Sequence, residues 1–139
     1  MSSSLSFNPL PRWVTAAVQA RRPWQWLLFL LVVVVCYLAL VPQPPKTVDL
    51  GWDKLNHASA FAALAVSGCF GFPGSRRAVL GVLLGLLARG GLIESVQYFG
   101  PGRSCDWHDL VADAVGIACG LALAMSVLKL ARQARAAPA

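Results

Sequence analysis

Four long apolar stretches, separated by short polar or proline-containing segments, dominate the hydropathy pattern of this chain. They cover residues 24–41, 55–72, 78–99 and 107–130. A hydrocarbon core ~30 Å thick needs about 20 helical residues at a rise of about 1.5 Å each. Each stretch is therefore long enough to cross or nearly cross a bilayer. The pattern predicts an all-α fold, a polytopic membrane bundle of four transmembrane helices.

The segments between these stretches set the expected boundaries. Pro42-Gln-Pro-Pro45 ends the first stretch, because proline cannot continue the hydrogen-bond ladder of a helix. The first stretch carries no charge, is too long for the apolar region of a signal peptide and has no A-x-A site after it, so we expect an uncleaved anchor. We expect one domain over residues 24–130, between cytoplasmic tails at residues 1–23 and 131–139. Residues 1–20 and 132–139 are expected to have little structure of their own.

Composition and charge support this interpretation. Of the 139 residues, 57% are hydrophobic and 13% charged, whereas soluble domains have roughly 25% charged residues. A soluble enzyme and a disulfide-stapled secreted module are thereby excluded. The net charge of +6 comes from basic residues at the ends of apolar stretches, so membrane topology explains it better than nucleic-acid binding does.

The basic residues also predict the orientation. With four spans, one side of the membrane receives Arg12, Arg21, Arg22, Arg76, Arg77, Lys129, Arg132 and Arg135. The other side receives only Lys46, Lys54 and Arg103, while Arg89 lies within a span. By the positive-inside rule, both termini are expected in the cytoplasm.

All six acidic residues fall in the outer half of this bundle. They are Asp49, Asp53, Glu94, Asp106, Asp109 and Asp113. Ionisable groups inside a span cost about 2.5–3.5 kcal/mol each and tend to face a cavity or one another. On an ideal helix, the last three acids share one face with Gly116 and Gly120, within an arc of about 80°. We therefore expect a polar cluster at the outer end and a close helix approach at the glycines.

Structural roles are open for several of these residues. Asp53 and Asp106 are candidate N-caps, and Asp109 suits the first turn of a helix. Glu94 and Asp113 are candidates for structural ion pairs with Arg89 and Arg103. Since Arg89 lies about 140° from Glu94 on an ideal helix, we predict that Arg89 pairs with Asp113. His108 is expected to be an interfacial polar residue.

Two polar segments resemble those of VanZ-like membrane proteins. Asp53-Lys-Leu-Asn-His57 resembles the D-K-x-x-H segment of that family. Glu94-Ser-Val-Gln97, then Phe99-Gly-Pro-Gly-Arg103 and Asp106-Trp-His-Asp109, resemble its E-x-x-Q-x-F-x-P-x-R-x-x-D-x-x-D segment. Asp113 stands where the family commonly has Asn. The resemblance covers residues 52–120 and implies a multi-pass protein of the bacterial cytoplasmic membrane, in a family named for a member linked to resistance to the glycopeptide teicoplanin.

The first functional hypothesis is a site that acts on or binds an envelope lipid or a lipid-linked glycan. Arg103 would bind a phosphate or carboxylate with its fork of donors, and Lys54 would support the anion. Glu94 and Asp109 would act as acid and base, and His57 would move protons. The resemblance adds Gln97, Asp53 and Asp106 to the substrate-binding set.

The second hypothesis is a non-catalytic membrane protein that binds an envelope component or a partner, in which the same cluster holds the bundle together. Ion transport is a third, weaker alternative, because no titratable relay continues into the cytoplasmic half. No metal-ligand spacing such as H-E-x-x-H occurs, and the four cysteines are widely spaced without a C-x-x-C pair. We therefore expect no metal, no cofactor and no disulfide framework, although the Asp, Glu and His side chains together leave a divalent metal as a weaker alternative. The oligomeric state is left open.

The topology can be tested with the cysteines of the chain. Cys105 falls in the predicted outer connection, whereas Cys36, Cys69 and Cys119 lie in apolar stretches. An impermeant thiol reagent added from outside should therefore label Cys105 and leave a Cys105→Ser variant unlabelled. A C-terminal reporter should report the cytoplasm. An external C-terminus would contradict four spans.

Overall fold

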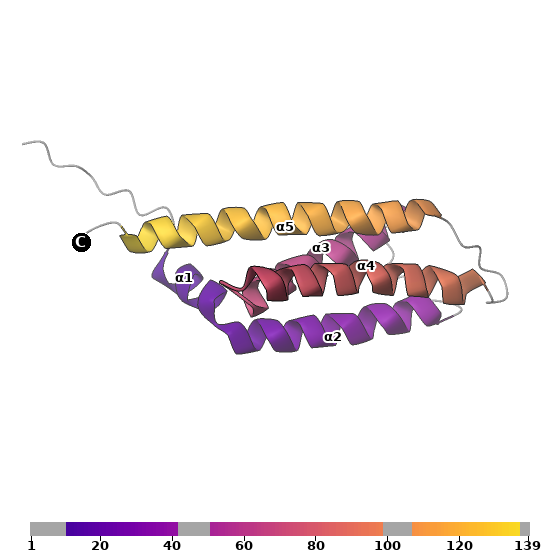
Figure 1. Ribbon diagram of the computed structural model, residues 1–139, viewed down its shortest axis with the longest axis horizontal. Coiled ribbons are helices and arrows are strands. Elements are labelled where there is room, and N and C mark those ends of the chain that lie inside the picture. Colours follow the sequence, from indigo (N-terminus) through magenta and orange to yellow (C-terminus); the bar gives the residue numbers. More distant parts are fainter. Residues whose placement is uncertain (1–10, 42–50, 99–106, 137–139) are drawn as a thin grey trace, which may run out of the picture.

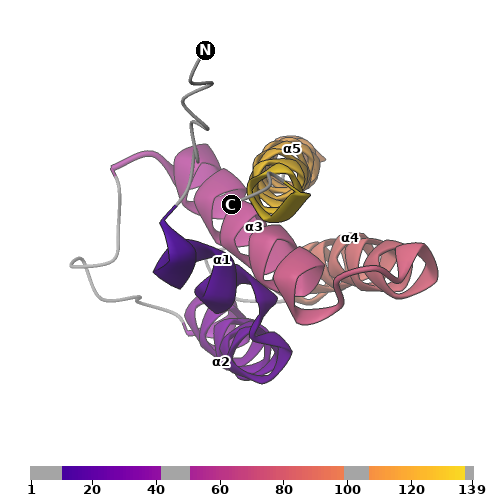
Figure 2. The same cartoon turned by 90° about the vertical axis from the view of Figure 1, so that its left-hand side faces the viewer.

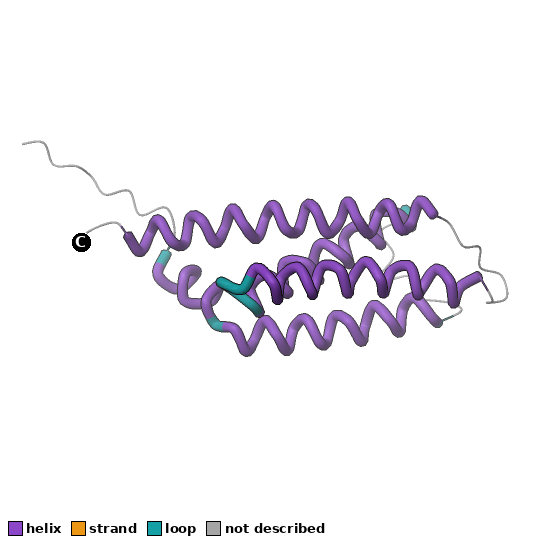
Figure 3. Tube along the Cα trace, viewed as in Figure 1, coloured by secondary structure: helices purple, strands orange, loops and turns teal. Residues whose placement is uncertain are grey.

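The computed structural model describes residues 11–41, 51–98 and 107–136, and these ranges form five helices without a strand (Figure 3). The helices are α1 (Arg12–Gln19), α2 (Arg21–Leu40), α3 (Asp53–Gly71), α4 (Arg76–Tyr98) and α5 (Trp107–Ala136). The predicted all-α class is confirmed. The last four helices coincide with the four apolar stretches to within a few residues, except that α5 continues to Ala136.

The expectation that residues 12–19 have little structure is wrong, because they form α1. An eight-residue helix is marginal in isolation, and packing explains its presence here. Val18 of α1 is buried in a cluster with Cys69, Phe70 and Ala124 from α3 and α5. The indole Nε1 of Trp24 donates a hydrogen bond to the carbonyl oxygen of Ala17 at 2.9 Å, which fixes α1 to the start of α2.

Two of the described helices are long and apolar enough to cross a membrane. These segments are Arg21–Ala39 in α2 and Trp107–Ala134 in α5. α2 also presents large apolar side chains outward, among them Trp26, Phe29 and Leu30. An exposed apolar face of this length is suited to a lipid environment and poorly suited to water.

α3 is the central helix of the bundle. It packs against α2, α4 and α5, and its interface with α5 is the most extensive in the described structure. Figures 1 and 2 show α3 enclosed by these three neighbours. The core around it contains Phe61, Leu64, Ala65, Leu86 and Ile117.

The backbones of α3 and α5 approach closely at two glycines. A Cβ atom added to Gly116 would collide with the carbonyl oxygen of Ala58, and one added to Gly120 with that of Ala62. The predicted close approach at these glycines is confirmed. Because four residues separate both the glycines and the alanines they face, α3 and α5 run parallel in a fixed register.

This seam gives a matched pair of stability predictions. Gly116→Ala should lower the free energy of unfolding by about 1–3 kcal/mol, the usual cost of overpacking. Gly85→Ala is the control, because a Cβ at Gly85 of α4 meets no atom within 4 Å. Gly85→Ala should be neutral or stabilising by up to about 1 kcal/mol, from its higher helix propensity. Denaturation of both variants in detergent tests this, and equal effects would contradict the close packing.

Candidate functional site

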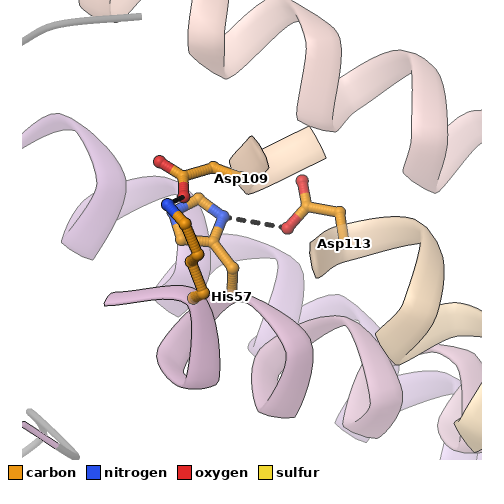
Figure 4. A network of polar contacts seen from close by, with 4 residues as sticks. His57, Asp109 and Asp113 are labelled. Atoms are coloured by element: carbon orange, nitrogen blue, oxygen red, sulfur yellow. Dashed lines mark hydrogen bonds and ion pairs between the residues drawn. The ribbon is translucent and has the colours of Figure 1, made fainter. Parts of the chain in front are cut away.

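Two charge pairs connect α3 to α5 at their shared N-terminal end. Lys54 Nζ lies 3.1 Å from Asp109 Oδ1, and His57 Nδ1 lies 2.9 Å from Asp113 Oδ1. Figure 4 shows Asp113 pointing at the imidazole ring of His57, with Asp109 near another edge of the ring. Residues more than 50 positions apart in the sequence are thus brought into direct contact.

The local helical geometry explains why these side chains meet. Asp53 and His57 are four residues apart and share one face of α3, as Asp109 and Asp113 share one face of α5. The two helices run parallel, with their register fixed by the glycine seam. Their N-terminal turns therefore place Lys54 and His57 of α3 opposite Asp109 and Asp113 of α5.

The acidic members of the pairs are the more buried ones. The side chain of Asp113 is 1% exposed and that of Asp109 9%, against 18% for His57 and 32% for Lys54. An isolated buried carboxylate would carry a penalty of several kcal/mol, so each of the two carboxylates needs a close hydrogen-bond donor.

α4 closes the site over Asp113. A Cβ added to Gly90 would lie only 2.5 Å from Asp113 Oδ2 and 3.4 Å from the Phe61 ring. Any larger residue at position 90 would push α4 away from this carboxylate. The contact of Gly90 with Asp113 was not foreseen, because the glycine pair at 90 and 91 carries no chemistry of its own.

The pair of His57 with Asp113 orients the imidazole. The Nδ1–H group donates to the carboxylate, which leaves Nε2 as the nitrogen that can accept or release a proton or bind a ligand. A carboxylate in this position holds one tautomer and one ring orientation, as the orienting acid does in catalytic triads. His57 was predicted to move protons, but its partner Asp113 could not be identified from the sequence.

The predicted ion pair of Arg89 with Asp113 is corrected by the structure. Arg89 reaches α2, where Nη2 donates to the carbonyl oxygen of Val32 at 2.8 Å and Nε and Nη2 contact Cys36 Sγ at 3.2 and 2.8 Å. Its Nη1 is buried without a hydrogen-bond partner in the described structure. The reason is rotational: Gly90, and not Arg89, occupies the face of α4 that meets Asp113.

Other predicted positions fall in different places. The N-cap position of α3 is Trp52, so Asp53 is the first helical residue and its predicted capping role is wrong. Asp109 lies in the first turn of α5, as expected. His108 is exposed and its ring lies against that of Trp107, with ring centroids 3.8 Å apart.

Four further predicted site residues lie at or beyond the limits of the described structure. Glu94 and Gln97 occupy the last two turns of α4, and Glu94 is one turn beyond Gly90. Arg103 and Asp106 lie outside the described residues. Among the described residues, Cys36, Cys69 and Cys119 are free thiols.

Comparison with known families gave one result. The model of the VanZ/LLP1 family matches residues 26–129, which is more than half of the chain. No curated protein and no solved structure matches. The family resemblance drawn from the two polar segments is confirmed.

The new assignment of partners can be tested by a double-mutant cycle. His57→Ala and Asp113→Ala should each destabilise the protein, and their effects should be coupled by about 0.5–3 kcal/mol. The same cycle between Arg89→Ala and Asp113→Ala should be additive within about 0.5 kcal/mol, since these residues make no direct pair. The measurement is equilibrium unfolding in mixed micelles. Strong coupling between Arg89 and Asp113, without coupling between His57 and Asp113, would support the predicted ion pair of Arg89 with Asp113.

Proposed function

Given that the chain belongs to the VanZ/LLP1 family, we propose that it binds or acts on an envelope lipid or a lipid-linked glycan at the outer end of a four-span bundle. The observation that carries the proposal is the oriented pair of His57 with Asp113, beside the pair of Lys54 with Asp109. Apolar membrane helices seldom contain such groups without a functional reason.

The four-span arrangement is supported by length and packing. α3 and α4 have 19 and 23 residues, which suits a bilayer core that needs about 20. α3 begins with the polar residues of the cluster, and α4 carries Arg89, so both are less apolar than α2 and α5. With both termini in the cytoplasm, the first turns of α3 and α5 face outward, toward the cell envelope.

The chemistry of the cluster fits an anionic headgroup. Lys54 supplies an ammonium group that is one-third exposed and can bind a phosphate or carboxylate oxygen. His57 supplies a proton donor or acceptor whose ring is held by Asp113. In this proposal Asp109 and Glu94 act as acid and base, while Arg103, Gln97, Asp53 and Asp106 bind the substrate, as the family resemblance implies.

A second candidate function has its own supporting observation. Each buried acid of α5 has one basic partner on α3, at the most extensive interface of the bundle. Such a one-to-one arrangement would also serve as a clamp in a non-catalytic protein that binds an envelope component.

Ligand identification by native mass spectrometry of the protein purified in lipid tests the proposal. Wild type and His108→Gln should carry the same phosphate- or carboxylate-containing lipid species, and Arg103→Ala should lose it, because the guanidinium fork is the anion anchor. His57→Gln should keep the species if the imidazole serves only in proton transfer. Absence of any anionic lipid from the wild type would contradict the proposal.

A cellular phenotype distinguishes a functional site from a cluster that only holds α3 and α5 together. His57→Gln and Asp109→Asn should lose the function scored as envelope-stress or glycopeptide susceptibility, while expression stays close to normal. An amide keeps the shape of the acid but removes its titratable charge. If the cluster is only a clamp, the phenotype of each variant should instead follow its measured thermal stability.

A further inference from the structure

We propose that Asp53, His57 and Asp109 form a binding site for a divalent transition-metal ion of the Mn²⁺ or Zn²⁺ type. Each of these residues offers one ligand atom, and the three atoms lie within 4.8 Å of one another. Asp53 and His57 come from the first two turns of α3, and Asp109 comes from the first turn of α5. The same three residues have roles in proton transfer and substrate binding in the proposed function, so cation binding is measured separately from lipid binding.

The spacing is close to that of a coordination sphere. Tetrahedral ligands at about 2.1 Å from an ion are about 3.4 Å apart. The ligand atoms, up to 4.8 Å apart, therefore need to converge by up to about 1.4 Å, a distance that rotation about side-chain bonds can cover. Because Asp53 and His57 are four residues apart on one helix face, they form a bidentate arm comparable to the i, i+4 ligand pairs of known metal sites.

Asp113 supplies the expected support for a histidine ligand. A metal-binding histidine usually donates its other ring N–H group to a carboxylate, which fixes the ring and raises the basicity of the ligating nitrogen. His57 makes this contact through Nδ1, 2.9 Å from the fully buried Asp113. Nε2 is then the ligating atom. This carboxylate comes from the second turn of α5 and is not one of the three ligands.

The charge balance favours a dication. Among the described residues of the cluster, Asp53, Asp109 and Asp113 contribute three negative charges, and Lys54 contributes one positive charge. With a neutral imidazole as ligand and the ammonium group of Lys54 displaced from Asp109, a divalent ion would neutralise two of these three negative charges. One imidazole and two carboxylates are ligands that suit Mn²⁺ and Zn²⁺.

Lys54 is the competitor for this site. Its ammonium group is 3.1 Å from Asp109 Oδ1, so the ion has to displace it. The side chain is one-third exposed, and its flexible stem allows it to turn toward solvent. Three protein ligands would leave coordination positions for water or for an oxygen of an anionic ligand, and there a bound ion supplies Lewis-acid chemistry.

The test uses the full, untagged chain in lipid nanodiscs and Mn²⁺ alone as the probe. Electron paramagnetic resonance titration should give one bound Mn²⁺ per chain, with nitrogen coupling in the pulsed spectrum from a ligating imidazole. His57→Gln should abolish the nitrogen coupling, and His108→Gln, which changes the only other histidine, should preserve it. Asp53→Asn and Asp109→Asn should each weaken binding by about tenfold or more.

Lys54→Met gives a result that a structural role would not produce. Removing the competing ammonium group should tighten Mn²⁺ binding, although it also removes an ion pair between α3 and α5. Asp113→Asn should weaken binding by about 10–100-fold, as expected for a supporting carboxylate. Should a variant of a buried residue fail to fold, Asp53→Asn still decides, because Asp53 is exposed.

Three results would overturn the metal site: no stoichiometric Mn²⁺ binding, nitrogen coupling retained in His57→Gln, or binding unchanged by Asp53→Asn. Lipid retention by metal-depleted protein is measured in parallel by native mass spectrometry. If the protein retains lipid but does not bind Mn²⁺, the metal site is wrong and the proposed function stands. If the protein binds Mn²⁺ but retains no anionic lipid, the metal site stands and the proposed function is wrong.

Discussion

The close approach of α3 and α5 at Gly116 and Gly120 is the constraint on which the rest of the structure depends. Without Cβ atoms at these positions, the backbone of α5 comes against the carbonyl groups of Ala58 and Ala62. A lipid-facing bundle gains little from the hydrophobic effect between helices, so such close packing is a main source of association. The parallel register that results decides which polar side chains meet at the N-terminal ends of α3 and α5.

The parallel register of α3 and α5 also determines how the buried carboxylates of α5 are stabilised. Carboxylates at positions 109 and 113 would be unfavourable on an apolar helix facing lipid. Against α3 they each find a basic partner within 3.1 Å, and Gly90 lets α4 cover Asp113. The same seam that excludes lipid therefore gathers four titratable groups in a partly dehydrated environment, where electrostatic interactions are stronger than in water.

Hydropathy was sufficient to predict the helices, because α2 to α5 each coincide with one apolar stretch, and the glycine face of α5 could be read from helical spacing. Pairing between helices could not be predicted in the same way. A helical wheel gives the face on which Asp113 lies but not the neighbour that this face meets, so Arg89 was chosen and His57 was the actual partner. α1 was missed because eight residues carry too short a pattern, and its stability comes from contacts of Val18 made in the folded bundle.

The position of Arg89 explains why the cluster retains an excess of acid. A guanidinium paired with Asp113 would have neutralised that carboxylate and left His57 without an orienting group. Instead, Arg89 donates to Val32 and Cys36 and holds α4 against α2. Arg89 therefore contacts α2, and the uncharged Gly90 faces Asp113. The rotation of α4 about its axis thus leaves Asp113 free to orient His57 and leaves the cluster with more acidic than basic residues. A site for a cation or for proton transfer requires both properties.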